Sequence, residues 1–201
     1  MTFSMVARCP RKLALGVCVS TALPAVGSRV PHAEAGVGAI ATQAYTKVSY
    51  GVEGLRLLKK GFSPQDSLEI MLKEDSNRES RQVIIIDRHG RTAAFTGKET
   101  VEWKGHLIGE DYAAAGNMLV GGDVIRAMAR AFEGSDGNLA ERLMKALEAG
   151  DKAGGDRRGR MSAALLVAGN QPTLELRVDR HYDPVRKLRR MFDEFMKAQK
   201  T

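Results

Sequence analysis

Thr2 directly follows the initiator methionine and opens a segment with the alternating pattern of a β-strand, residues 2–8. Methionine is normally removed when the next residue is small, so we expect the mature chain to begin with this threonine. A free α-amino group, with a reference pKa near ~7.7–8.0, is partly neutral at physiological pH and can take the proton from its own hydroxyl. The chemistry expected of Thr2 is therefore nucleophilic attack on a carbonyl. The alternative is that Thr2 is an ordinary strand residue.

Gly116 and Asn117 end another expected strand at a turn. A backbone N–H and a side-chain amide can converge there on the oxyanion that nucleophilic attack creates. We therefore place Asn117 among the catalytic candidates and Gly116 beside it in substrate binding. The alternative for Asn117 is a turn asparagine whose side chain bonds the local backbone.

A glycine-rich loop, residues 154–159, combines one carboxylate with guanidinium groups. We expect Asp156 to hold the amine or a basic residue of the site, and Arg157 or Arg158 to clamp a substrate carboxylate with two hydrogen bonds. The alternative is a loop with a surface ion pair. The loop lacks the Lys-Ser/Thr ending that a phosphate-binding loop requires.

The first two strands, 2–8 and 14–20, are expected to form a hairpin centred on Arg11. That register puts Ser20 opposite Thr2, where it would bind substrate, and a slip of one residue would remove it. The same register separates Cys9 from Cys18, so we expect no disulfide.

Further candidates follow the later strands. Thr42 and Gln43 end the third expected strand on the side where a neighbour of Thr2 could lie, and Gln43 is taken as a substrate-binding candidate. His32 could approach the site, although a polar loop side chain is the simpler interpretation. The histidines show no metal-ligand spacing, and no dinucleotide motif occurs, so we expect neither a metal nor an organic cofactor.

The elements that must position these residues form an ordered series. Strands are expected at 2–8, 14–20, 36–42, 82–87, 92–96, 106–108, 112–115, 162–168 and 173–178, and helices at 51–60, 63–73, from 123, around 139–147 and from 183. Strands group with strands and helices with helices, which is not the alternation of a parallel doubly wound sheet. This order fits an α+β fold of two mainly antiparallel sheets, packed face to face and covered by helices, in a single domain over residues 1–201.

Composition restricts the partners. The net charge is +7, but aromatic residues are only 5% and do not alternate with the basic ones, so we expect no nucleic acid. No apolar run is long enough to span a bilayer, and the signal-like stretch 13–23 alternates as a strand would, so we expect no membrane association and a cytoplasmic chain. The apolar seam of the last helix could serve a subunit contact, so a homo-oligomer, dimer or higher, is expected.

The strand-first order with an N-terminal threonine resembles the N-terminal nucleophile (Ntn) hydrolases, and more specifically the prokaryotic family called domain of unknown function 1028, which is regarded as Ntn-hydrolase-like. The matching segments run almost end to end: residues 2–4, 6–8, 25–27, 30–31, 35–39, 41–43, 50–51, 54–55, 81–83, 94–97, 116–119, 153–159, 162–163, 178–179, 181 and 183–184. The resemblance implies a four-layer αββα sandwich. The chain departs from the family pattern at Cys9, Met161 and Arg180. The family usually has a glutamine where this chain has Met161, and the absence of that side-chain amide can alter substrate contacts of the preceding loop.

These observations lead to one function and two alternatives. The expected function is an Ntn-type amidohydrolase that uses Thr2 to cleave a small amide or ureide, whose anionic group an arginine would bind. The first alternative is a non-enzymatic binding protein on the same fold, and retention of Met1 would favour it. The second is an interaction protein whose basic surface meets an anionic polymer, with binding that weakens steeply as salt rises.

Overall fold

The computed structural model describes residues 2–169 and 173–199. One sheet has six strands in the order β10-β9-β2-β1-β8-β7, and all its neighbouring pairs are antiparallel. Its strands are β1 (Thr2–Cys9), β2 (Ala14–Thr21), β7 (Gly105–Gly109), β8 (Tyr112–Asn117), β9 (Ser162–Ala168) and β10 (Leu174–Val178). The strand that begins at Thr2 therefore lies inside this sheet, with hydrogen-bonded neighbours on both sides.

The other sheet has four antiparallel strands in the order β3-β4-β5-β6. They are β3 (Pro31–Glu34), β4 (Gly38–Ala44), β5 (Arg81–Asp87) and β6 (Thr92–Thr96). Strand β3 was not expected, because its four residues carry no apolar pattern and begin with a proline. It lies at the sheet edge, where a short strand with a proline is tolerated.

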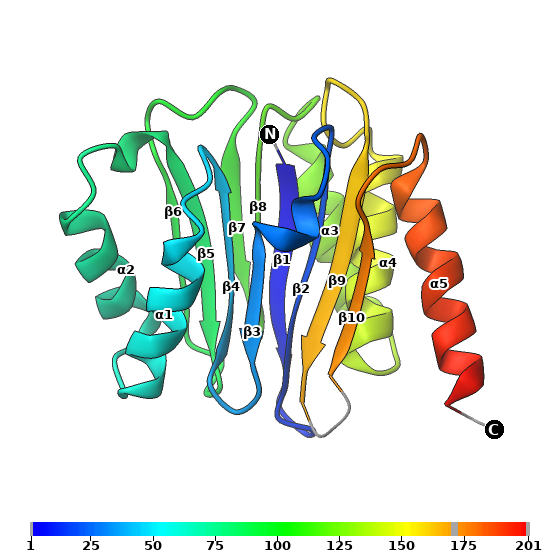
Figure 1. The fold of residues 1–201 in the computed structure, drawn as a ribbon, viewed down its shortest axis with the longest axis horizontal. Coiled ribbons are helices and arrows are strands. Elements are labelled where there is room, and N and C mark those ends of the chain that lie inside the picture. The colour runs from blue at the N-terminus through cyan, green and yellow to red at the C-terminus, as the bar shows by residue number, and fades with distance from the viewer. Residues whose placement is uncertain (1, 170–172, 200–201) are drawn as a thin grey trace.

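Helices cover the outer face of each sheet (Figure 1). The helices α1 (Ser49–Lys59) and α2 (Pro64–Lys73) pack on the four-stranded sheet, whereas α3 (Asp123–Glu133), α4 (Leu139–Lys152) and α5 (Pro184–Ala198) pack on the six-stranded one. Two short 3-10 helices, η1 (Val26–Ser28) and η2 (Arg78–Ser80), complete the described elements. The four-layer αββα arrangement that the resemblance implies is confirmed.

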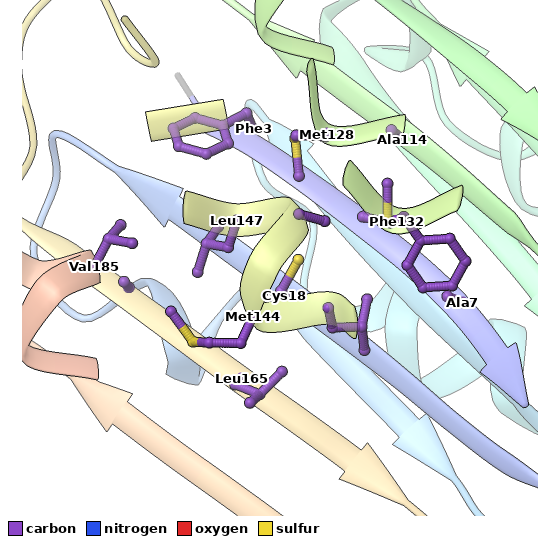
Figure 2. Packing of buried hydrophobic residues seen from close by; sticks show 14 of the residues in the cluster. Phe3, Ala7, Cys18, Ala114, Met128, Phe132, Met144, Leu147, Leu165 and Val185 are labelled. Atoms are coloured by element: carbon purple, nitrogen blue, oxygen red, sulfur yellow. The ribbon is translucent and has the colours of Figure 1, made fainter. Parts of the chain in front are cut away.

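Apolar side chains divide into three buried clusters, one between each pair of layers. Alternation along β1 sends Phe3 and Met5 toward α3 and α4, and Val6 toward the other sheet. Figure 2 shows Phe3 close to Met128 in the helix-facing cluster. Because alternate residues share a face, Thr2 and Ser4 lie on the Val6 side, between the two sheets.

The β1–β2 hairpin is present, but its register differs by one residue from the expected one. Ser20 pairs with Phe3, and Cys18 pairs with Met5. The connection holds four residues, and its last, Leu13, has a positive φ of 50°. A turn centred on Arg11 would need an odd number of connecting residues. Because the connection has four, the pairing of β1 with β2 is shifted by one residue.

Local signals at the helix starts were more reliable. The side chain of Ser63 accepts a hydrogen bond from the backbone N–H of Asp66, whose carboxylate accepts one in return, so the predicted start of α2 is confirmed. The helix expected from residue 123 also begins there as α3, with Gly122 in the cap position. Throughout the described part of the chain, no helix has the length and apolar character that crossing a bilayer requires.

Candidate active site

The candidate nucleophile lies at the start of β1, where the two sheets face each other. Thr2 is only 5% exposed, and its hydroxyl lies 3.3 Å from Thr21 Oγ1. Thr2 pairs with Asn117 of β8 on one side of the strand. The neighbouring hydroxyl therefore comes from Thr21 and not from Ser20, whose predicted position beside Thr2 is wrong.

Ser20 takes a structural place instead. It shares a face with Phe3, toward the helices, and its hydroxyl donates to the backbone carbonyl of Ser162 at 3.3 Å. A serine on that face points away from the inter-sheet space that holds Thr2.

A chain of buried amides joins the two sheets beside Thr2. Ser4 Oγ donates to Gln43 Oε1 at 2.7 Å, and Gln43 Nε2 donates to Gln82 Oε1 at 2.8 Å. Asn117 Nδ2 donates to the same Gln82 oxygen at 2.8 Å. All four side chains are at most 2% exposed. Their hydrogen bonds matter because a buried polar group left without a partner costs about 1–3 kcal/mol.

Gln82 is the centre of this network and was not among the expected site residues. Its Nε2 lies 2.8 Å from the carbonyl oxygen of Gly116 and 2.9 Å from Thr96 Oγ1. It stands at the head of β5, whose following residues are apolar and fully buried. A single amide at the head of such a strand is the sequence signal that could have identified it.

The structure brings Gly116 and Asn117 to the candidate site. Gly116 pairs with Phe3 of β1 and Gly105 of β7. A Cβ at this position would lie 2.4 Å from Leu119 Cδ1, so only glycine fits without a shift. Asn117 is not a free turn residue, because its side chain is bound into the inter-sheet network.

Asp156 fixes the glycine-rich loop to the end of β2. Its carboxylate accepts a hydrogen bond from the backbone N–H of Ala22 at 3.0 Å and forms an ion pair with Arg158 at 2.9 Å. Its backbone also bridges to Leu119. The carboxylate thus binds the residue that directly follows Thr21, and Asp156 as a whole is 5% exposed.

The two arginines of this loop differ. Arg158 is paired with Asp156 through its guanidinium and its backbone N–H. The backbone N–H of Arg157 donates to Met118 at 3.2 Å, while its side chain is exposed. Met161, one of the departures from the family pattern, donates its backbone N–H to the Thr21 carbonyl at 2.8 Å. The missing amide therefore does not remove this backbone contact.

A cavity of about 50 Å³ adjoins Thr2. Its lining combines three hydroxyl-bearing residues, one cation and five apolar residues: Thr2, Thr21, Thr46, Arg29, Leu23, Pro24, Val26, Val30 and Ala44. Because a water molecule takes about 30 Å³ in the liquid, this space holds a group of a few atoms. It is a pocket for one functional group beside the threonine hydroxyl.

Strained backbone gathers around the same end of β1. Ala25, Ala44 and Met118 have φ values of 55°, 66° and 55°, in the left-handed region that a side chain disfavours. Ala44 lines the pocket, Ala25 lies between two lining residues, and Met118 follows Asn117. Such conformations cost roughly 1–3 kcal/mol each and concentrate at functional sites.

The remaining expected residues lie elsewhere. Thr42 is buried and donates its hydroxyl to the Lys47 carbonyl at 3.2 Å. His32 lines a different cavity, of about 350 Å³, between β3 and the pair β9–β10. Burial lowers the pKa of His32, and a hydrogen bond with the Arg29 backbone opposes this shift. Across 2–169 and 173–199, no three His, Cys, Asp or Glu side chains gather as a metal ion would require.

Comparisons with known proteins show what this chain is similar to. Residues 2–188 match the model of a family described as "Family of unknown function (DUF1028)". A crystal structure of a DUF1028 protein from Silicibacter pomeroyi is 35% identical, with a TM-score of 0.91, and the match covers 96% of this chain and 85% of that chain. Anbu (ancestral beta-subunit) from Yersinia bercovieri is also similar, at 11% identity and a TM-score of 0.41, over 98% of this chain and 95% of that chain. Among curated proteins, none matches the chain. The chain belongs to the family of unknown function DUF1028.

Proposed function

We propose that this protein is an Ntn-type amidohydrolase that cleaves a small amide or ureide with Thr2 as its nucleophile, after removal of Met1. The observation that carries the proposal is the position of Thr2. It begins a strand in the interior of the six-stranded sheet and lines a pocket together with a second threonine. Its backbone pairs with Asn117 of β8, and the next residue, Phe3, pairs with both neighbouring strands, so the hydroxyl is positioned before any substrate arrives.

The proton transfers of the reaction use only the groups of Thr2 and water. The α-amine takes the hydroxyl proton, directly or through a water molecule, and Oγ1 attacks the carbonyl carbon of the substrate. The C–N bond then breaks, and the proton passes to the leaving nitrogen. The acyl group remains as an ester on Oγ1 until water, activated by the same amine, releases the acid and restores the hydroxyl.

Asn117 is the proposed oxyanion donor. A side-chain amide nitrogen carries two N–H groups, and Gln82 accepts a hydrogen bond from Asn117 Nδ2. The second N–H is the one proposed to stabilise the oxyanion, and the bond to Gln82 would hold it in place. Asp156 is proposed as a positioning residue, since its carboxylate binds Ala22 beside Thr21.

The test begins with the intact mass of untagged protein. The proposal requires the loss of one methionine, because a peptide bond would otherwise occupy the amine of Thr2. The processed protein is then treated with a small β-lactone, which acylates an activated hydroxyl and adds its full mass to the chain. We expect one added acyl group, located by peptide mapping on Thr2.

Two variants make this result specific. Thr2→Ala should abolish the added mass. Ser20→Ala, which removes a buried hydroxyl from the opposite face of the adjacent strand, should leave it unchanged. Retention of Met1, or equal acylation of Thr2→Ala, would reject the nucleophile and favour a non-enzymatic binding protein.

A further inference from the structure

The pocket beside Thr2 has one charged wall. Among the described residues that line it, Arg29 is the only one with an ionisable side chain. Leu23, Pro24 and Val30 are among its apolar neighbours in the lining. Apolar walls displace water, which strengthens the attraction between a guanidinium and an anion.

Arg29 is also free to bind a ligand. In the described part of the chain, its guanidinium has no hydrogen-bond or ion-pair partner, whereas Arg158 and Arg160 are each paired with an aspartate. The side chain is exposed at the mouth of the pocket. An arginine that lines a pocket and has no protein partner there can use its planar donors on a bound group.

The backbone that carries Arg29 is anchored to both sheets. The N–H of Ala25 donates to the Asp179 carbonyl at 2.9 Å, and the N–H of Val26 donates to Ser162 Oγ at 3.1 Å. On the other side, the N–H of Thr42 donates to the Val30 carbonyl at 3.2 Å. The residues before and after Arg29 are therefore held in place, which limits where its side chain can reach.

We propose that Arg29 binds a carboxylate of the substrate, so that the substrate class is a small amide with a carboxylate close to the scissile bond. This inference rests on the proposed function for the identity of the reacting bond, but not for the binding of the anion. A carboxylate consists of three heavy atoms, which suits a pocket of about 50 Å³. Arginine matches it with two parallel N–H donors.

This assignment replaces the one expected from the sequence. Arg158 already has Asp156 as its anion, and neither Arg157 nor Arg158 lines the pocket. Arg29 was overlooked because it stands between a turn and a short edge strand, a segment without any recognisable motif.

The experiment measures binding in Thr2→Ala protein, so that it does not depend on the nucleophile. Isothermal titration compares N-acetylglycine with N-acetylglycinamide, two small amides that differ in one carboxylate. We expect the acid to bind about tenfold or more tightly, as a charge-assisted hydrogen bond of roughly 1.5–3 kcal/mol implies. Adding Arg29→Met should remove this preference.

Two further variants provide the comparison. Arg130→Met, which removes an exposed positive charge from α3, should retain the preference, and so should Arg157→Met. An undiminished preference in Arg29→Met, a loss in Arg157→Met instead, tighter binding of inorganic phosphate than of the acid, or no preference in the parent would each overturn the proposal. Because no acylation is involved, these outcomes are separate from failure of Thr2 as a nucleophile.

Discussion

Thr2 and Asn117 lie directly opposite each other in the pairing of β1 with β8. The residue proposed to attack and the residue proposed to stabilise the resulting charge are thus placed by one backbone ladder. Neither depends on a mobile loop for its position relative to the other. Thr2 and Asn117 are 5% and 2% exposed, so both are buried.

This pairing leads to a prediction for Asn117→Ala. Loss of the side-chain amide should lower the rate of Thr2 acylation by a β-lactone about 10²- to 10³-fold, as removal of an oxyanion donor does in other enzymes. The chain should still fold, because Gln82 Oε1 keeps Gln43 as a donor. The acylation rate is measured by intact mass over time, with circular dichroism as the folding control. A rate within threefold of the wild-type value would contradict the role.

Gln82→Leu should destabilise the fold. The substitution leaves Gln43 Nε2, Asn117 Nδ2 and the Gly116 carbonyl without their bonds to Gln82. With about 1–3 kcal/mol for each buried group without a partner, we expect the free energy of unfolding to fall by about 3 kcal/mol or more. Urea unfolding followed by circular dichroism measures it.

The control for that variant is Gln65→Leu on α2, where an exposed glutamine donates to Glu69 at 2.7 Å. Gln65→Leu should change the free energy of unfolding by no more than about 0.5 kcal/mol, as most surface substitutions do. Equal unfolding midpoints for Gln65→Leu and Gln82→Leu would show that the inter-sheet network contributes little.

Asp75 should make stability depend on pH in the acid range. Burial opposes its ionisation, but hydrogen bonds from Arg81, Tyr50 and the backbone of Asn77 outweigh burial and hold the pKa of Asp75 below its usual range. The folded pKa is lower than the unfolded value of ~3.9, so this stabilisation is present above that pH and is lost as the pH falls toward the folded pKa.

The free energy of unfolding should therefore decrease below about pH 4. Asp75→Asn should reduce the free energy of unfolding at pH 7 by about 3 kcal/mol, because it leaves a buried arginine without its charged partner. It should also make the free energy of unfolding depend less steeply on pH in the acid range. Urea titrations at several pH values measure both effects, with exposed Asp136→Asn as the control. If the free energy of unfolding of Asp75→Asn fell as steeply with decreasing pH as that of the wild type, Asp75 would not be the source of the acid dependence.

The two cysteines should differ in reactivity. Both are free, as expected from the sequence, but Cys18 is fully buried and Cys9 is only partly buried. Burial raises the pKa of the Cys18 thiol to about 12, against weaker opposing effects of backbone hydrogen bonds. Because the thiolate is the reactive form, iodoacetamide at pH 8 should label only Cys9 in the native protein and both residues in urea. Peptide mapping distinguishes them, and native labelling of Cys18 at the rate of Cys9 would contradict its burial.

Much of the fold could be predicted from local signals. The capped start of α2 and the apolar strand β5 follow from residue types that act over a few positions. The β1–β2 register could not be predicted in this way. It depends on a connection of four residues that ends with Leu13 in a left-handed conformation, and alternation alone allows either parity.

The candidate site was predictable in part for a related reason. Thr2 and Asn117 stand at strand ends and carry recognisable chemistry. Gln82 contacts β4 and β8, and Arg29 lines a pocket together with the start of β1, so both depend on segments that are far apart in the sequence. No spacing along the chain encodes those contacts, so they emerge only when both sheets are assembled.

The interior position of β1 also has a practical consequence for laboratory work. Any affinity tag fused ahead of Thr2 would be joined directly to a residue that lines the pocket and begins a strand bonded on both sides. Such a tag would keep the nitrogen of Thr2 in a peptide bond and so block the amine that the proposed reaction needs, and the purified protein would then be inactive in an assay of that reaction. A tag that follows α5 is attached at the outer helical layer, away from β1 (Figure 1), and is the appropriate choice for functional assays.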